Sequence, residues 1–202
     1  ERSRGLGDVY KRQQFTADHD VWAVTSAQGL YSKIKLSESS HNLERPCVLE
    51  TAEGKVIAVA EAALVDYARM RVRRPDDSKT ALVSRLHGSV VSRLPLTTPW
   101  RVVMAADTAG DLLENNHLML NLNAPSKIAD TSWIKPGKVI REVSLSTQGG
   151  IDCVDFAVEY GLEYIEFDAG WYGPQDREDS DARTVSRRGL DLQKVLKYAK
   201  QH

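Results

Sequence analysis

The sequence contains little cysteine: two of its 202 residues, Cys47 and Cys153, lie far apart and in unlike contexts. Two isolated cysteines provide neither a disulfide framework nor a CxxC metal motif, so we interpret both as small buried apolar residues. The five histidines show no metal-ligand spacing. No apolar run is long enough to span a bilayer, and no membrane span is predicted.

An excess of charge of one sign is also missing, because 27 Lys and Arg residues oppose 28 Asp and Glu residues. A balanced surface has no field that attracts nucleic acid or an anionic membrane, so we expect neither as a partner. Hydrophobic residues make up 42% of the sequence, which is sufficient for a globular core. The length is appropriate for one or two domains.

The first residues, ERSRGLGDVYKRQ, are basic, contain glycine and lack strand or helix periodicity. They include no apolar stretch followed by a small-residue cleavage site, so no signal peptide is predicted. The segment resembles translated adapter sequence, and an ordinary disordered tail is the alternative. We therefore predict that residues 1–13 are a non-native or disordered leader.

Short strands are expected across residues 20–105 at roughly ten-residue spacing, which is typical of a β-sandwich. Glu53 and Gly54 form a plausible hairpin turn between strands at residues 47–51 and 55–60. Helical content in this part of the chain is expected to be small.

Several segments after residue 80 have their own signatures. The run ALVSRLHGSVVSRLPL is interpreted as two strands that break near His87 and Gly88, and TPWRVVMAA as another strand. DTAGDLLENN favours a short helix capped by Asp107 or Thr108. HLMLNLNAPSKIAD is interpreted as a strand followed by a connecting loop.

From Val139 onwards, expected strands alternate with expected helices, which predicts a parallel sheet. The strands are VIREVSL and EYIEFDAG, and the helices are GGIDCVDFAVEYG and LDLQKVLKYAK. The first helix has one apolar face, which includes Val154 and Ala157, and Gly161 follows its last turn as a terminating glycine. The fold class is therefore mixed, with a β region followed by an α/β region.

The segment YIEFDAGWYG carries the strongest functional signal. Asp168 ends an expected buried strand, and Trp171 follows it on a glycine-flanked loop. Ligands of parallel α/β folds bind beyond the carboxyl ends of the strands. A carboxylate accepts hydrogen bonds from sugar hydroxyls, and an indole packs against the C–H face of a sugar ring. We predict that Asp168 and Trp171 bind sugar; the alternative is a loop-capping Asp beside aromatics packed in a barrel rim.

Two other acidic features are weaker candidates. Glu61 ends the β run of KVIAVAEAAL, and its surroundings in the sequence indicate a surface carboxylate rather than a metal ligand. The acidic loop QDREDSDAR lacks the glycine and the terminal Glu of an EF-hand, so we interpret it as a solvated loop.

Three long segments resemble glycoside hydrolase family 97 and occur in that family's order over about residues 20–202. They are GKVIAVAEAALVDYARM, TPWRVVMAADTAGDLLENNHLMLNLNAPSKIADTSWIKPGKVIRE and YIEFDAGWYG. The resemblance implies an N-terminal β-super-sandwich, a catalytic (β/α)8 barrel and calcium-dependent cleavage of α-glucosides or α-galactosides. Residues 14–125 would then form a partial β-super-sandwich with a linker. Residues 126–202 would form the first two βα units of the TIM barrel.

The resemblance also assigns roles to individual residues. Family members have one calcium-ligating glutamate in the N-terminal domain, and Glu61 of AEAAL matches that position. The general acid, the remaining calcium glutamates and the nucleophile or base lie on later barrel strands of the family. We therefore expect a fragment without catalytic residues and without activity of its own. VIREVSL stands where many relatives have an aromatic-rich strand, so glucoside and galactoside specificity both remain open.

Two other classes of function are compatible with these residues. One is a non-catalytic carbohydrate-binding β-sandwich module, which sugar binding by residues 14–125 would favour. The other is a barrel glycosidase of the α-galactosidase clan outside family 97, which insensitivity to chelators would favour. The family resemblance implies an oligosaccharide or polysaccharide substrate, a periplasmic or extracellular location and a monomeric full-length protein. Inverting and retaining mechanisms both remain open.

Overall fold

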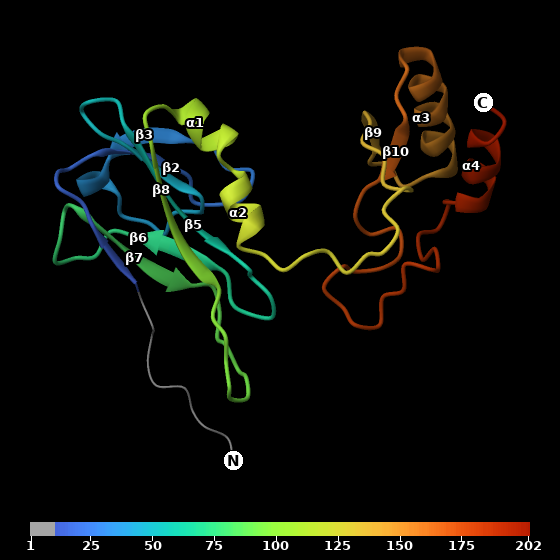
Figure 1. Cartoon of the computed structure of the whole chain (residues 1–202). Coiled ribbons are helices and arrows are strands. Elements are labelled where there is room, and N and C mark those ends of the chain that lie inside the picture. The colour runs from blue at the N-terminus through green and yellow to red at the C-terminus, as the bar shows by residue number, and fades with distance from the viewer. Residues whose placement is uncertain (1–10) are drawn as a thin grey trace. The chain divides into compact units, whose positions relative to one another are not determined.

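The computed structural model describes residues 11–202 (Figure 1). The chain divides into two compact units, residues 1–127 and residues 128–202, called here the N-terminal unit and the C-terminal unit. The predicted boundary between residues 125 and 126 lies close to this division. The mixed β and α/β pattern is confirmed, since the first unit is built on antiparallel sheets and the second on a parallel strand pair.

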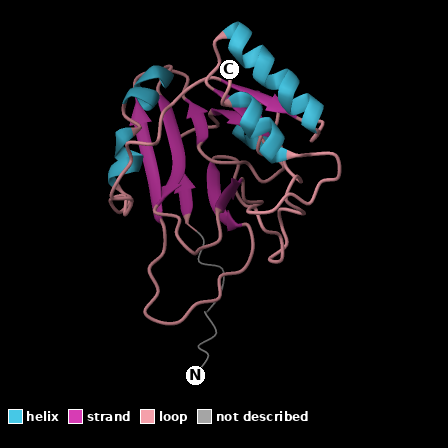
Figure 2. Ribbon diagram, turned by 90° about the vertical axis from the view of Figure 1, so that its right-hand side faces the viewer, coloured by secondary structure: helices cyan, strands magenta, loops and turns pink. Residues whose placement is uncertain are grey.

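Two antiparallel sheets form the N-terminal unit (Figures 1 and 2). The larger sheet has the strand order β3-β2-β4-β5-β8, and the smaller has the order β1-β7-β6. The strands are β1 (Arg12–Gln14), β2 (Asp20–Ala23), β3 (Ser32–Lys35), β4 (Cys47–Glu50), β5 (Val56–Ala62), β6 (Met70–Arg73), β7 (Ala81–Leu86) and β8 (Trp100–Ala106). A short 3-10 helix, η1 (Leu36–Glu38), follows β3.

The two sheets share one hydrophobic core. Burial alternates along β4 and β6, as expected when one face of a strand points inward and the other outward. Val21, Leu49 and Val59 of the larger sheet belong to the same buried cluster as Met70 and Leu82 of the smaller sheet. The alternation of apolar and polar residues that predicted strands in the sequence therefore also directs the apolar side chains into this core.

The predicted leader is wrong for Arg12 and Gln13, which belong to β1. This strand runs antiparallel to β7, with Arg12 opposite Val83 and Gln13 opposite Leu82. The backbone groups of β7 provide a template for pairing, and a pairing partner about seventy residues away leaves no local signature. The remainder of the predicted leader, residues 1–10, lies outside the described residues.

The expected second strand of ALVSRLHGSVVSRLPL is also wrong. Strand β7 ends at Leu86, and residues 87–99 contain no strand. Val91 and Leu94 are 96% and 72% exposed, so their apolar side chains do not contribute to the core. Pro95 lacks a backbone N–H, which disfavours a place in a sheet ladder.

Two short helices, α1 (Ala109–Glu114) and α2 (His117–Asn121), follow β8 and lie beside the larger sheet (Figure 1). Of the two predicted caps, Asp107 and Thr108, Thr108 is confirmed, because its Oγ1 accepts a hydrogen bond from the Asp111 N–H at 3.3 Å. The Asp111 carboxylate accepts in turn from the Thr108 N–H at 2.8 Å, which completes a capping box. Helix α1 is therefore specified by its own local sequence.

Helix α2 occupies a segment that the sequence predicts as a strand. Met119 and Leu122, three residues apart, pack against buried alanines of β5 and Val102 of β8. The Asn123 side chain accepts from the Ala63 N–H at 2.9 Å and donates to the Met119 carbonyl at 2.6 Å. Packing against the sheet selects the helical spacing, although Leu118, Leu120 and Leu122 alternate like residues of a strand.

The C-terminal unit contains the predicted β-α-β-α order. Its elements are β9 (Val139–Glu142), α3 (Thr147–Tyr160), β10 (Tyr164–Phe167) and α4 (Leu192–Ala199). β9 and β10 pair in parallel, with Glu142 opposite Phe167. Gly161 ends α3 with a left-handed φ of 64°, as predicted for a terminating glycine. Two βα units are therefore present, and the barrel to which they were assigned stays a prediction.

Close packing of α3 on β10 and α4 depends on Gly150. A Cβ at this buried position would lie 2.8 Å from the Phe167 ring and 2.9 Å from a Val195 methyl group. The two helices lie side by side in both views (Figures 1 and 2). The small residue thus brings helix, strand and second helix together.

Both cysteines are free thiols, and their environments differ. Cys47 is 1% exposed, and this burial raises the pKa of its thiol to about 12. Cys153 on α3 is half-buried, so the interpretation of two buried cysteines is confirmed for Cys47 only. Among residues 11–202 no helix is long and apolar enough to cross a membrane.

Iodoacetamide is expected to alkylate Cys153 in the native chain and to leave Cys47 unmodified. The thiolate is the reactive species, and Cys47 is both inaccessible and held in the thiol form. Peptide mass spectrometry after timed labelling measures each site, and labelling in urea provides the control in which both react. Equal labelling of the two cysteines in the native state would contradict the described burial.

Candidate functional site

The carboxyl ends of β9 and β10 place Glu142 and Asp168 side by side. The Asp168 N–H donates to the Glu142 carbonyl at 3.0 Å, which continues the parallel ladder to the strand tips. The Asp168 side chain is 40% exposed, and its Oδ2 lies 3.8 Å from an Arg141 guanidinium nitrogen. Asp168 thus presents an accessible carboxylate beside a cation, which suits binding of hydroxyl-bearing ligands.

Trp171 follows on the loop after β10 and is half-buried. Its ring packs edge-on against Tyr172, with centroids 5.0 Å apart and planes at 77°. Its carbonyl accepts from the backbone N–H groups of Ser186 and Arg187 at 2.9 and 3.2 Å. The backbone of Trp171 therefore joins the strand-end loop to a later segment of the same unit.

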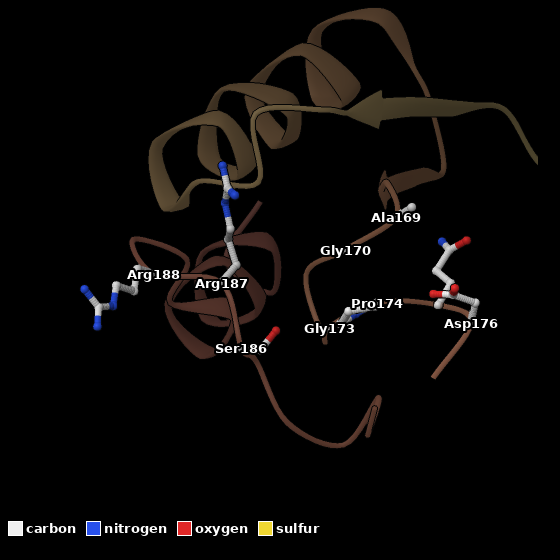
Figure 3. A pocket seen from close by; sticks show the side chains of 9 residues that line it. Ala169, Gly170, Gly173, Pro174, Asp176, Ser186, Arg187 and Arg188 are labelled. Carbon is white, nitrogen blue, oxygen red and sulfur yellow. The ribbon is translucent and has the colours of Figure 1, made fainter. Parts of the chain in front are cut away.

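A cavity of about 890 Å³ opens between these two segments (Figure 3). One wall consists of Ala169, Gly170 and residues 173–176, and the other of residues 186–188. Asp168 immediately precedes the first wall in sequence and Trp171 lies within its span, but neither residue lines the cavity. The predicted strand-end location therefore does coincide with a hollow, although the residues that line it differ from those predicted.

The first wall depends on two glycines with left-handed backbone conformations. Gly170 has a φ of 97° and Gly173 a φ of 113°, which L side chains rarely adopt. A Cβ at Gly173 would also lie 2.8 Å from the Ser180 hydroxyl. That hydroxyl donates to the Pro174 carbonyl at 2.6 Å and so holds the turn closed.

Glu142 is a residue of this site that sequence reasoning missed. Its side chain is buried at the end of β9 and accepts from the N–H groups of Ser144 and Leu145 at 2.8 and 2.7 Å. The Ser144 hydroxyl donates to the same carboxylate. A Cβ at Gly149 would collide with it, so the carboxylate lies against the first turn of α3. The available signal was an acidic residue at a strand end, but VIREVSL was assigned to the strand throughout.

Glu61 on β5 is buried, with 3% of its side chain exposed, so the interpretation from sequence alone as a surface carboxylate is wrong. It forms ion pairs with Arg45 and Arg101. Its two oxygens also accept from the Met70 N–H at 2.9 and 3.1 Å. Glu61 is therefore the centre of a charge network inside the N-terminal unit.

These surroundings do not fit an open calcium ligand. Two guanidinium groups already balance the Glu61 charge, and they would repel a divalent cation. Among residues 11–202 no group of three or more His, Cys, Asp or Glu side chains could hold a metal ion. The calcium role of Glu61 remains a prediction from resemblance, and we derive no catalytic step through calcium.

A second buried carboxylate, Glu44, belongs to the same network. Arg69 and Arg71 contact its two oxygens at 2.7 and 2.6 Å, and Arg45 lies 3.7 Å away. Because Arg45 also pairs with Glu61, it links the two carboxylates. Burial by itself would raise the pKa of Glu44, but the adjacent Arg71 and Arg69 groups outweigh burial and lower that pKa.

The pKa direction of Glu44 predicts acid sensitivity. A lowered folded-state pKa contributes stability above the ordinary value of 4.5, and this contribution is lost as pH falls through the folded-state pKa. We expect the urea midpoint of the wild-type chain to fall between about pH 5 and pH 3, and to fall less in Glu44→Gln. Parallel pH profiles of the two proteins would contradict this assignment.

Comparison with known proteins identifies the family. A family model described as Glycosyl-hydrolase 97 N-terminal matches residues 10–125, which is more than half of the chain. The chain belongs to glycoside hydrolase family 97. It is 24% identical to a retaining alpha-galactosidase of Bacteroides thetaiotaomicron over 94% of this chain and 34% of that protein.

Solved family 97 structures agree with this assignment. The chain matches a family 97 enzyme from Pseudoalteromonas sp. strain K8 in complex with acarbose, with a TM-score of 0.72 and 26% identity. That match covers 91% of this chain and 32% of the enzyme. A beta-arabinopyranosidase structure shares the fold at 17% identity, with a TM-score of 0.68. The family 97 chain thus spans about a third of the length of these relatives.

Proposed function

We propose that this chain is part, about a third by length, of a retaining glycosidase that cleaves α-galactosidic or α-glucosidic bonds. The family match over residues 10–125 carries the proposal. Similarity to a retaining alpha-galactosidase supports the galactoside. Similarity to an enzyme that binds acarbose supports a glucose-like ligand. We propose that the two sheets belong to a β-super-sandwich and that the βα units begin a TIM barrel.

In a retaining mechanism one carboxylic acid protonates the leaving oxygen, and a second carboxylate attacks the anomeric carbon. We assign neither role to residues of this chain. Asp168 would accept hydrogen bonds from sugar hydroxyls, with Arg141 keeping its carboxylate oriented. The Trp171 ring would pack against a sugar face. These residues would position substrate for carboxylates that lie elsewhere.

Calcium assistance, a periplasmic or extracellular location and a monomeric full-length enzyme belong to the proposal on grounds of family resemblance. The bound substrate would be an oligosaccharide or polysaccharide. No step of the proposed mechanism depends on calcium.

Enzyme assays test this proposal. The 202-residue chain alone is expected to release no nitrophenol from 4-nitrophenyl α-galactoside or α-glucoside. A protein that continues this chain to the full length of its relatives is expected to hydrolyse one of them, and NMR is expected to show an α-anomer as first product. Turnover by the chain alone, or a β-anomer as first product from the longer protein, would contradict the proposal.

A further inference from the structure

We propose that the cavity at the carboxyl end of β10 binds a glycan that carries an anionic substituent, a carboxylate or a sulfate, and that Arg187 recognises this group. The inference rests on the proposed function and specifies the substrate class of the same site.

The pairing of arginines in the C-terminal unit is uneven. Three of its five arginines contact carboxylates, in the pairs Arg141–Asp168, Arg177–Asp179 and Arg183–Asp181. Arg187 and Arg188 have no side-chain partner among the described residues, and these are the two arginines that line the cavity. The cavity wall therefore presents positive charge that this unit does not neutralise.

Hydrogen bonds hold the backbone of this wall in place. Within it, the Ser186 and Arg187 N–H groups donate to the Trp171 carbonyl. After it, the Gly189 carbonyl accepts from the N–H and hydroxyl of Thr147 at 3.0 and 2.8 Å. The Thr147 hydroxyl also accepts from the Asp191 N–H at 2.7 Å. A guanidinium on an anchored backbone loses less conformational entropy on binding than one on a free loop.

The direction of the side chains favours Arg187 over Arg188. In Figure 3 the Arg187 side chain extends toward the start of α3, whereas Arg188 points away from the wall that carries Gly173 and Asp176. A guanidinium binds carboxylate or sulfate through two parallel hydrogen bonds, which a neutral hydroxyl cannot reproduce. Of the two arginines that line the cavity, Arg187 is the one that does not point away from the opposite wall, so we assign recognition of the anionic group to it.

The remaining lining suits the rest of a glycan. Asp176, Gln175 and Ser186 provide acceptors and donors for hydroxyls, and Gly170 and Gly173 leave the backbone open to the ligand. A volume of about 890 Å³ is in the range of small-molecule sites. A free ion lacks the hydroxyl groups that these polar residues can bind, so it is expected to gain less here than an anion attached to a sugar.

Binding to the complete 202-residue chain tests the inference. Titration calorimetry would compare digalacturonate, galactose 6-sulfate, neutral melibiose and inorganic sulfate. At least one charged sugar is expected to bind about tenfold more tightly than melibiose, and Arg187→Gln is expected to remove this preference. Arg183→Gln removes the same charge from an arginine that pairs with Asp181 outside the cavity, and it is expected to leave the preference unchanged.

The two charged sugars distinguish the sources of the anion: preference for digalacturonate indicates a uronate, and preference for galactose 6-sulfate indicates a sulfated sugar. Melibiose binding equal to that of both charged sugars would overturn the inference and leave the proposed function intact. An unchanged preference in Arg187→Gln, or inorganic sulfate binding as tightly as the sugars, would also overturn it. Absence of all glycan binding overturns it too, while the nitrophenyl glycoside assays judge the proposed function separately.

Discussion

Replacing Glu61 with alanine is expected to lower the free energy of unfolding of the N-terminal unit by about 3–5 kcal/mol. The substitution leaves Arg45 and Arg101, whose side chains are 19% and 16% exposed, without their carboxylate partner. It also removes the acceptor of the Met70 N–H on β6. Urea unfolding of the full chain in the presence of a chelator measures the loss.

Asp107→Ala is the matched control for this prediction. Its ion pair with Lys55 is also formed by a carboxylate, but the two side chains are 78% and 57% exposed. Solvent screens such a pair, so the expected loss is much smaller than in Glu61→Ala. Equal losses in the two variants would contradict the buried network around Glu61.

The wild-type chain and Glu61→Ala also test the prediction that Glu61 binds calcium. A melting temperature that rises with calcium in the wild-type chain and not in Glu61→Ala would show that Glu61 binds the ion. Equal calcium responses would assign Glu61 to the ion-pair network alone. The stability loss in chelator is expected in either case, since it depends only on the contacts described.

Glu142→Ala is expected to destabilise the C-terminal unit by about 2–4 kcal/mol, because hydrogen bonds to a charged group contribute about 1.5–3 kcal/mol and two backbone donors lose their shared acceptor. The donors are the Ser144 and Leu145 N–H groups in the loop between β9 and α3. Hydrogen exchange of peptides across residues 143–160, measured by mass spectrometry, reports on this unit alone. Faster exchange in that segment is the expected result.

Glu166→Ala removes an exposed carboxylate from the adjacent strand β10 and serves as the control. It is expected to leave exchange across residues 143–160 unchanged. A second variant, Glu142→Gln, keeps one acceptor oxygen and is expected to fall between wild type and Glu142→Ala. Unaltered exchange in Glu142→Ala would contradict the role given to this carboxylate in holding the loop after β9.

Capping residues were the most predictable features of the fold. Thr108 before α1 and Gly161 after α3 act on backbone groups within a few residues, so their effect is contained in the local sequence. The alternation of strands with helices after Val139 is equally local, and both βα units are present. Ligands of parallel α/β folds bind beyond the carboxyl ends of the strands, and these ends lie at the same edge of the sheet. This rule predicted the place of the cavity next to Asp168.

Other features depended on partners distant in the chain. Strand β1 exists because β7 pairs with it, and α2 is helical because Met119 and Leu122 pack on β5 and β8. The charge network needs Glu44, Glu61 and four arginines from separate strands and loops. The spacing of residues along the chain does not predict contacts with distant partners, so the local sequence around Glu61 indicated a surface position.

The sequence by itself determined the family, the β and α/β halves and the strand end beside which the cavity lies, since these follow from motif order, periodicity and local capping. Only the tertiary structure decided which carboxylates are buried, which arginines of residues 128–202 lack a carboxylate partner and which residues line the cavity. The burial of a side chain and the pairing of its charge depend on residues that are distant in sequence and that folding brings into contact. Asp168 was therefore found from its position in a strand, whereas the burial of Glu142 and the place of Arg187 in the cavity wall became apparent only from their surroundings.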